Sequence, residues 1–393
     1  MRALALSLAC LVGAVLLAGV LSLSDGDTAS RGLALSLAFG TAFGVILQRA
    51  RFCFFCNARD LIERRDARGV LAILLALAVG IAGYALVIGA WLPVPQPGRL
   101  PPDAHIGPVS WVLALAALAF GIGMAVSGSC ISAHLYRLGE GSPTAPFALV
   151  GTAAGFVLGF LTWNPLYLAV ISEAPVIWLP HHLGYAGTLG ASLALLALLA
   201  VAALAFARPQ PAEEASVAGR NSLLRAGHAL FVARWPALIG GLAIGALSAA
   251  SYLRVGPLGV TAEIGSLARS AAANWNLLPE TLHGLDGFRG CATVVKAAVL
   301  SENGLFVLGL VGGSFASAVV AGQFAPRRPS WRDVSAGLAG GVLMGWGAMT
   351  ALGCTVGVLL SGIHAGALSG WVFLLAAFAG VLIGLPLRRR IAA

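Results

Sequence analysis

The six cysteines are the residues of this sequence whose types and spacing best suit chemistry. Cys53 and Cys130 lie in the first half of the chain, and Cys291 and Cys354 lie in the second half. A thiol is a weak hydrogen-bond donor and acceptor, and its sulfur is soft and polarisable. A row of thiols would therefore suit a ligand with terminal sulfur or selenium better than a hard oxyanion. Six cysteines in 393 residues are too few for a disulfide scaffold.

Other roles for these thiols stay open at this point. Cys53-Phe-Phe-Cys56 is a single Cys-x-x-Cys pair, a redox or metal motif in some soluble folds, but no second pair or histidine follows at zinc-finger spacing. On a helix the two thiols would lie on adjacent turns, where a reversible disulfide could form. A catalytic couple would need a positioned histidine, and His134 follows Cys130 by four residues. Each thiol could also be a small buried hydrophobe.

The elements that position these residues are long apolar runs. Hydrophobic residues make up 59% of the chain and charged residues 10%, against about half and about a quarter in soluble domains, which excludes a soluble or disordered protein. A membrane-spanning helix needs about 20 mostly apolar residues. Ten such runs occur, at residues 2–21, 32–48, 70–92, 111–127, 147–163, 185–207, 235–253, 305–323, 334–352 and 368–387.

The arginines between these runs predict the orientation in the membrane. In a soluble protein a net charge of +9 would suggest nucleic-acid binding, but here the basic residues lie at the ends of apolar runs, as topology signals do. Arginine-rich stretches after residue 48, in 208–234, at 327–332 and at 388–390 predict cytoplasmic segments, whereas 92–110 and 164–184 are poor in Lys and Arg. Both termini are then predicted to be cytoplasmic. The first run could be a signal peptide, although we favour a spanning helix.

Two matched segments predict an internal repeat. Gly121-Ile-Gly-Met-Ala-Val-Ser-Gly-Ser-Cys130 and Gly345-Trp-Gly-Ala-Met-Thr-Ala-Leu-Gly-Cys354 both place glycines nine and seven residues before a cysteine. Each continues into a Gly-containing stretch too short to span a bilayer, and each half has an earlier cysteine, Cys53 or Cys291. The charge pattern gives the two halves opposite orientations. Inverted repeats with interrupted helices are typical of transporters with a site near the midplane.

These observations predict an all-α polytopic membrane protein with about ten transmembrane helices plus short half-helices in two inverted repeats. We divide it into a leading helix and external loop (1–31), a first repeat (32–207), a cytoplasmic linker (208–234) and a second repeat (235–393). Lys296, the only lysine, is expected to extend to the membrane surface, with compensation of the substrate's charge as the alternative. Glu263 is expected to be a solvated helix cap near a loop, with proton coupling as the alternative. We expect no metal and no cofactor, and no ATP-binding P-loop motif occurs.

Three segments together resemble the YeeE/YedE family of sulfur-transport membrane proteins. They are Gly40-Thr-Ala-Phe-Gly-Val-Ile-Leu-Gln-Arg-Ala-Arg-Phe-Cys53, Gly121-Ile-Gly-Met with Gly128-Ser-Cys130, and Gly345-Trp-Gly with Leu352-Gly-Cys354. The resemblance runs from about residue 32 to the C-terminus. It implies uptake of thiosulfate across the bacterial inner membrane along a narrow path lined by three cysteines, here Cys53, Cys130 and Cys354. It also implies a cytoplasmic TusA-like sulfurtransferase as partner.

The chain departs from the simple family pattern at several places. It has a leading span, a polar linker, Cys56 close to Cys53, and Cys291 in the second half. Cys291 is a weaker candidate for substrate binding, related to Cys53 by the predicted repeat. The sequence thus predicts a permease for thiosulfate or a related sulfur-containing anion. The alternative is a membrane-embedded sulfur-transfer or redox relay protein that uses Cys53 and Cys56.

Overall fold

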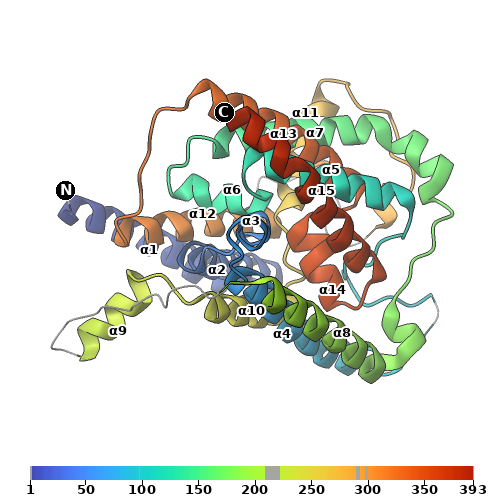
Figure 1. The fold of residues 1–393 in the computed structure, drawn as a ribbon, viewed down its shortest axis with the longest axis horizontal. Helices are drawn as coiled ribbons and strands as arrows, with labels where there is room; N and C mark the ends of the chain where they lie inside the picture. The colour runs from blue at the N-terminus through green and yellow to red at the C-terminus, as the bar shows by residue number, and fades with distance from the viewer. Residues whose placement is uncertain (1, 97, 209–221, 289–292, 297–299, 393) are drawn as a thin grey trace.

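The computed structural model describes residues 2–96, 98–208, 222–288, 293–296 and 300–392. This part of the chain is helical, with isolated β-bridges between Pro108 and Val176 and between Trp178 and Ala367 (Figure 1). Every apolar run expected from the sequence falls on a long helix. These are α1 (Arg2–Ser24), α2 (Thr28–Ala50), α4 (Arg68–Trp91), α5 (Trp111–Ser127), α7 (Ala145–Leu166), α8 (Leu179–Phe206), α10 (Ala237–Arg254), α12 (Glu302–Val320), α13 (Trp331–Thr350) and α15 (Leu368–Ala392).

Short helices interrupt or extend these long ones. In the described ranges they are α3 (Phe54–Arg64), α6 (Ile131–Gly139), the π-helix η1 (Tyr167–Ile171), α9 (Ser222–Phe231), α11 (Thr261–Asn274), the 3-10 helix η2 (Leu285–Gly287), the π-helix η3 (Thr355–Ser361) and α14 (Gly362–His364). Among the described residues, nine helical segments are long and apolar enough to cross a membrane, and α13 with the helices after its 45° bend makes a tenth. The prediction of an all-α polytopic membrane protein is confirmed.

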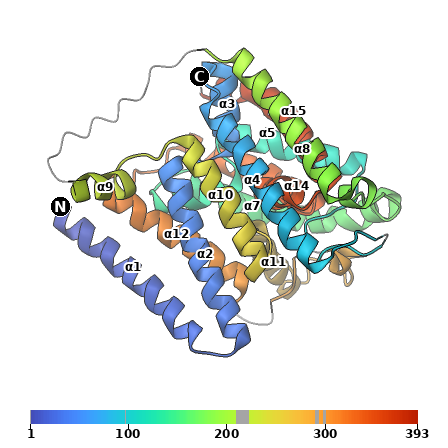
Figure 2. The ribbon, with the colours of Figure 1, turned by 90° about the horizontal axis from the view of Figure 1, so that it is seen from below.

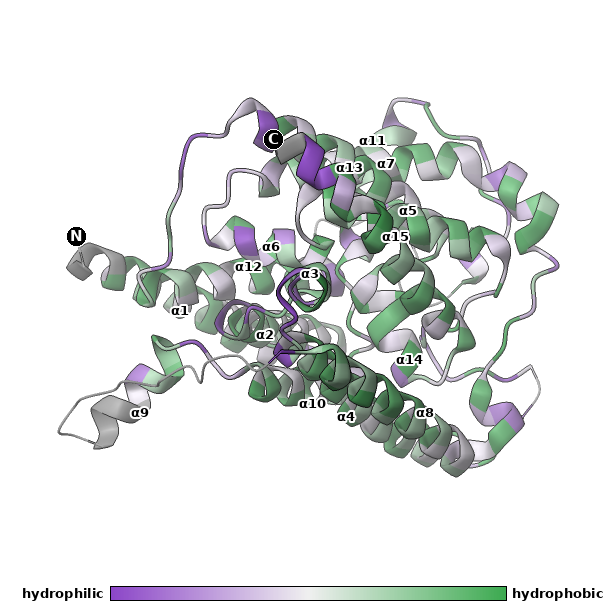
Figure 3. Cartoon of the chain, in the orientation of Figure 1, coloured by the Kyte–Doolittle hydropathy of each residue, from purple (hydrophilic) through white to green (hydrophobic). Residues whose placement is uncertain are grey.

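The hydropathy of the surface fits this arrangement. Apolar residues cover most of the lengths of the long helices, and polar residues gather in loops and at helix ends (Figure 3). Large side chains such as Leu198, Val201 and Leu375 are exposed on the outer faces of α8 and α15, where lipid would cover them. Figure 2 shows both ends of the chain toward the same side of the bundle, and the turn between α1 and α2 lies on the other side.

The main helix pairs join the two halves of the chain. Helix α2 packs on α12, α4 on α10, α5 on α15, and α7 on α13, while α5 and α13 cross each other. Exchanging α2 with α10, α4 with α12, α5 with α13 and α7 with α15 reproduces the same set of pairs. A two-fold relation between the halves would give this pattern. The boundaries 32–207 and 235–393 remain a prediction.

The glycines of the two matched segments lie where these helices cross. A methyl group added at Gly123 would lie 2.6 Å from the carbonyl oxygen of Gly340 on α13. One added at Gly347 would lie 2.5 Å from the carbonyl oxygen of Ala116 on α5. Backbones that approach this closely leave room only for hydrogen, as is common between membrane helices. The second glycine of each Gly-x-Gly segment therefore lies in the α5–α13 crossing, and the first packs on α15 (Gly121) or on α7 (Gly345).

Candidate functional site

Three cysteines lie at chain breaks of the same design. In each break a long helix ends near a residue with left-handed backbone, one further residue follows, and a cysteine in extended conformation precedes the first residue of a short helix. The left-handed residues are Arg51 (φ 51°), Gly128 (φ 89°) and Leu352 (φ 60°). The cysteines that follow them by two positions are Cys53 before α3, Cys130 before α6 and Cys354 before η3.

Each thiol thus occupies the N-cap position of a helix. The backbone N–H of Cys56 donates to Cys53 Sγ at 3.3 Å, and that of Val356 donates to Cys354 Sγ at 3.4 Å. Cys130 makes no capping bond. Oxygen side chains are the preferred caps, and sulfur is a weak acceptor. The free N–H groups and positive dipole ends of these helices are therefore only partly compensated, which favours an anion nearby.

The first two thiols are in contact with each other. The Sγ atoms of Cys130 and Cys53 lie 3.9 Å apart, and Cys130 Sγ lies 3.3 Å from Ser132 Oγ. Both cysteine side chains are fully buried. Because α3 and α6 begin at these residues, two helix N-termini meet at one pair of thiols. The geometry offers soft sulfur contacts and helix N–H groups in the same place.

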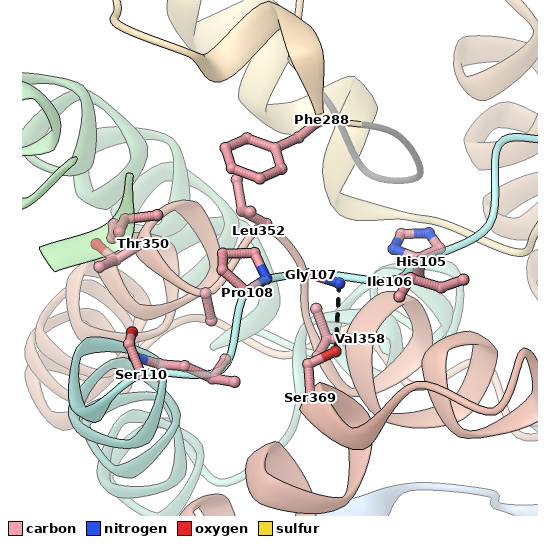
Figure 4. Close-up of a pocket in the computed structure, with 13 residues that line it drawn as sticks. His105, Ile106, Gly107, Pro108, Ser110, Phe288, Thr350, Leu352, Val358 and Ser369 are labelled. Carbon is pink, nitrogen blue, oxygen red and sulfur yellow. Dashed lines mark hydrogen bonds between the residues drawn. The ribbon is translucent and has the colours of Figure 1, made fainter. Parts of the chain in front are cut away.

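Residues on both sides of Cys354 in the sequence line a small cavity. Residues 350–352 and Val358 line the cavity together with the loop that leads into α5 (Figure 4). The side chains of Phe288, Leu352 and Pro108 lie in a row in this view, and the N–H of Gly107 donates to Ser369 Oγ at 3.3 Å. The cavity volume of about 20 Å³ has room for about one water molecule.

The remaining candidate residues have different surroundings. Cys291 lies outside the described residues. In the pattern of helix pairs, α11 holds the place in the second half that α3 holds in the first, and its N-cap is Val260 rather than a cysteine. His134 Nε2 lies 3.1 Å from Ser127 Oγ, so its ring is engaged with a hydroxyl rather than with Cys130. The catalytic Cys–His arrangement is not formed here.

Two expectations about charged residues were wrong. Glu263 is buried on α11 rather than solvated. Lys296 does not extend to the membrane surface, since its ammonium group pairs with Glu263 and donates to Ser301 Oγ at 3.3 Å. Ion pairing keeps both charges at low exposure inside the protein. The 33 residues between the two partners hide this pair from local sequence patterns.

The sequence interpretation also missed the surroundings of Cys56. Its thiol donates to the carbonyl oxygen of Gly128 at 3.9 Å and accepts from Arg137 Nη2 at 3.2 Å. Arg137 lies on α6 seven residues after Cys130, which is two helical turns. The seven-residue spacing is the one sequence signal that could have placed an arginine on the same face of α6 as the Cys130 thiol.

Comparison with known proteins agrees with this architecture. A family model described as "Sulphur transport" matches residues 49–383. The chain belongs to this family. The resemblance to YeeE/YedE proteins is thereby confirmed, and the chain is a transporter rather than an enzyme. The family does not favour the alternative of a redox or sulfur-transfer relay.

Several curated relatives align over much of the chain. The thiosulfate transporter TsuA of Spirochaeta thermophila is 28% identical over 354 residues, which cover 86% of this chain and 93% of the relative. The thiosulfate transporter TsuA of Escherichia coli is 25% identical over 374 residues, covering 87% and 90%. The probable transporter YedE of Salmonella typhimurium is 36% identical over 164 residues, covering 42% and 38%.

Proposed function

We propose that this chain takes up thiosulfate, or a related sulfur-containing anion, along a path on which Cys354, Cys130 and Cys53 contact the substrate. The observation that carries the proposal is the recurrence of one design, a buried thiol at the N-cap of a short helix, at three breaks. The names of the two TsuA relatives support the choice of anion.

The chemistry of the anion matches both parts of this design. Thiosulfate carries a terminal sulfur and three oxygens, so it needs soft contacts at one end and charge compensation at the other. Thiols can donate S–H···S hydrogen bonds to the terminal sulfur, and helix N-termini favour the negative charge. The anion would then pass from Cys354 to the Cys53–Cys130 pair without full hydration at any step.

The test is uptake of ³⁵S-thiosulfate by proteoliposomes that contain the purified chain. Cys53→Ala, Cys130→Ala and Cys354→Ala should each lower the initial rate at least tenfold. Each removes one heavy atom from a buried site, at a cost to stability of about 1 kcal/mol, so the variants should still fold. Cys10→Ala is the matched control because Cys10 is exposed on α1, away from the breaks.

Serine variants test whether softness matters. Cys130→Ser keeps a small hydrogen-bonding group but replaces sulfur with oxygen. If uptake through Cys130→Ser equals that of the wild type, the thiol argument is wrong. Normal uptake by all three alanine variants would refute the path itself. Growth of a sulfur-transport-deficient bacterium on thiosulfate gives the same comparison in cells.

We further propose that the protein lies in the bacterial inner membrane with both termini cytoplasmic, and that a TusA-like sulfurtransferase receives sulfur on that side. The arginines at 388–390 and between α2 and α4 support this orientation. A C-terminal fusion to green fluorescent protein should fluoresce, and one to alkaline phosphatase should be inactive. The reverse result would overturn the orientation. Pull-down of a TusA-like protein by the tagged chain tests the partner.

A further inference from the structure

Cationic side chains from two separate helices, α6 and α15, lie close to Cys56 on α3. Arg137 of α6 donates to its sulfur at 3.2 Å. Arg388 of α15 lies with its guanidinium carbon 5.4 Å from the centre of the Phe55 ring. A methyl group added at Gly128 would lie 2.9 Å from Arg388 Nη1, so this guanidinium also packs against the break before Cys130. We refer to Cys56, Arg137 and Arg388 as the Cys56 cluster.

The two arginines of the Cys56 cluster have no carboxylate within ion-pair distance in the described part of the chain. Within the described ranges, neither Arg137 nor Arg388 forms an ion pair with a carboxylate. Glu63, which lies on the neighbouring helix α3, pairs with Arg389 at 3.0 Å instead. Arg388 Nη1 is buried and makes no hydrogen bond. Both arginine side chains are half-buried. In membrane proteins, half-buried cations that have no carboxylate partner commonly mark ion pathways.

The Cys56 cluster is continuous with the pair of thiols described above. Cys130 Sγ lies 3.9 Å from Cys53 Sγ, and Cys53 Sγ accepts from the N–H of Cys56 at 3.3 Å. Arg137 then donates to the Cys56 sulfur. The cluster lies toward the end of the bundle where α15 ends, beside α3 in Figure 2. That end is the one the arginine distribution predicts to be cytoplasmic.

We propose that Cys56, Arg137 and Arg388 form a further anion-binding site, which receives the transported anion as it leaves the Cys53–Cys130 pair. The guanidinium groups bind the oxyanion end through charge-assisted hydrogen bonds, and the Cys56 thiol contacts the terminal sulfur. The ligand class is a sulfur oxyanion with a terminal sulfur. Sulfate, which offers only the oxyanion part, binds the arginines more weakly. This inference rests on the proposed transport of such an anion.

The test compares adjacent arginines. Arg137→Gln and Arg388→Gln should each lower the initial rate of ³⁵S-thiosulfate uptake at least tenfold in proteoliposomes. Arg389→Gln is the matched control, since Arg389 is exposed, lies one residue further along α15 and already has a carboxylate partner. It should stay within twofold of the wild type. Arg137→Lys keeps the charge but not the planar fork, and should give an intermediate rate.

A second measurement reports binding directly. The purified chain in detergent is treated with N-ethylmaleimide, and the modification of Cys56 is followed by mass spectrometry of its peptide. Thiosulfate should slow the modification at least fivefold in the wild type, and sulfate should slow it less. This protection should be lost in Arg388→Gln. A purely structural role for the arginine would change the basal modification rate but would leave protection by the anion intact.

The outcomes separate the two proposals. If Arg137→Gln and Arg388→Gln both take up thiosulfate at the wild-type rate, and the anion still protects Cys56 in them, the anion site is overturned. The proposed transport function is unaffected by that result. Absence of thiosulfate uptake by the wild-type chain overturns the proposed function. If sulfate and thiosulfate then still protect Cys56 in an Arg388-dependent manner, the anion site stands without it. If Arg137→Gln fails to fold, Arg388→Gln and Arg137→Lys decide.

Discussion

Gly345→Ala should measurably destabilise the crossing of α13 and α7. A methyl group at this position would lie 2.9 Å from Gly155 Cα and 2.9 Å from Phe156 N, and closer still to the carbonyl oxygen of Thr152, whereas ordinary contact begins near 3.4 Å. Overpacking of this kind costs about 1–3 kcal/mol, and backbone neighbours place it at the upper end. Alanine returns about 1 kcal/mol of helix propensity. The net loss is about 2 kcal/mol, or about 30-fold in the folding equilibrium.

The assay is thermal unfolding of the purified chain in detergent, followed by the fluorescence of a thiol-reactive dye that labels newly exposed cysteines. Gly190→Ala is the control because Gly190 is exposed on α8 and an added methyl group there meets nothing within 4 Å. That variant should be as stable as the wild type or slightly more stable, since only the propensity term remains. A Gly345→Ala protein with an unchanged or raised melting temperature would refute the close crossing of α7 and α13.

Three further predictions follow from the same structure. Diamide, which takes up the two hydrogens that the thiols lose, should join Cys53 to Cys130 in a disulfide, because their sulfur atoms lie 3.9 Å apart and need to approach by only about 2 Å. Uptake should then stop until dithiothreitol is added. Absence of the cross-linked peptide in mass spectrometry would contradict the contact between the two thiols. Lys296→Met should lower the free energy of unfolding by about 3–5 kcal/mol, because it leaves Glu263 as a nearly buried charge without its cationic partner. Adding Glu263→Gln should recover most of that loss, as measured by thermal unfolding. A double variant that is less stable than Lys296→Met would argue against the pair. Burial lowers the pKa of His105 from 6.5 to about 4, so its neutral form contributes stability that is present above pH 6.5 and is lost as the pH falls toward 4. Over this pH range the melting temperature of His105→Gln should therefore fall less than that of the wild type. Equal falls in the two proteins would refute this assignment.

The long helices could be predicted from the sequence because the membrane imposes one strong constraint. A span must be about 20 apolar residues long, and the charged residues must lie at its ends, so composition alone locates it. The matched glycines also predicted a shared role for two distant segments, and all four lie where helices cross closely. What the sequence could not supply was the pairing of helices between halves, since contacts such as that between α2 and α12 leave no local pattern.

The site was only partly predictable, for two physical reasons. A position with left-handed backbone can usually be predicted because it is occupied by glycine. Of the three positions before the cysteines only Gly128 is a glycine, whereas Arg51 and Leu352 adopt this backbone without a local signal. The short stretch after Cys354 was expected from its length, but the residues at which the backbone turns before Cys53 and Cys354 were not. Arg388 lies more than 300 residues from Cys56, so no spacing rule could join them.

The design of the breaks sets stability against substrate contact. A non-glycine residue in left-handed conformation costs of order 1–3 kcal/mol, and Arg51 and Leu352 both carry that cost. A cysteine at an N-cap forgoes much of the ~1 kcal/mol that a serine or aspartate would contribute there. Cys53 and Cys354 are both in that position, each two residues after a strained residue. Cys53→Ser should then raise the stability of the protein at the start of α3, because a hydroxyl caps a helix better than a thiol does. The same variant should lower the rate of uptake, because a soft anion needs contact with sulfur. A purely structural role for the thiols cannot produce a variant that is more stable than the wild type and yet transports less.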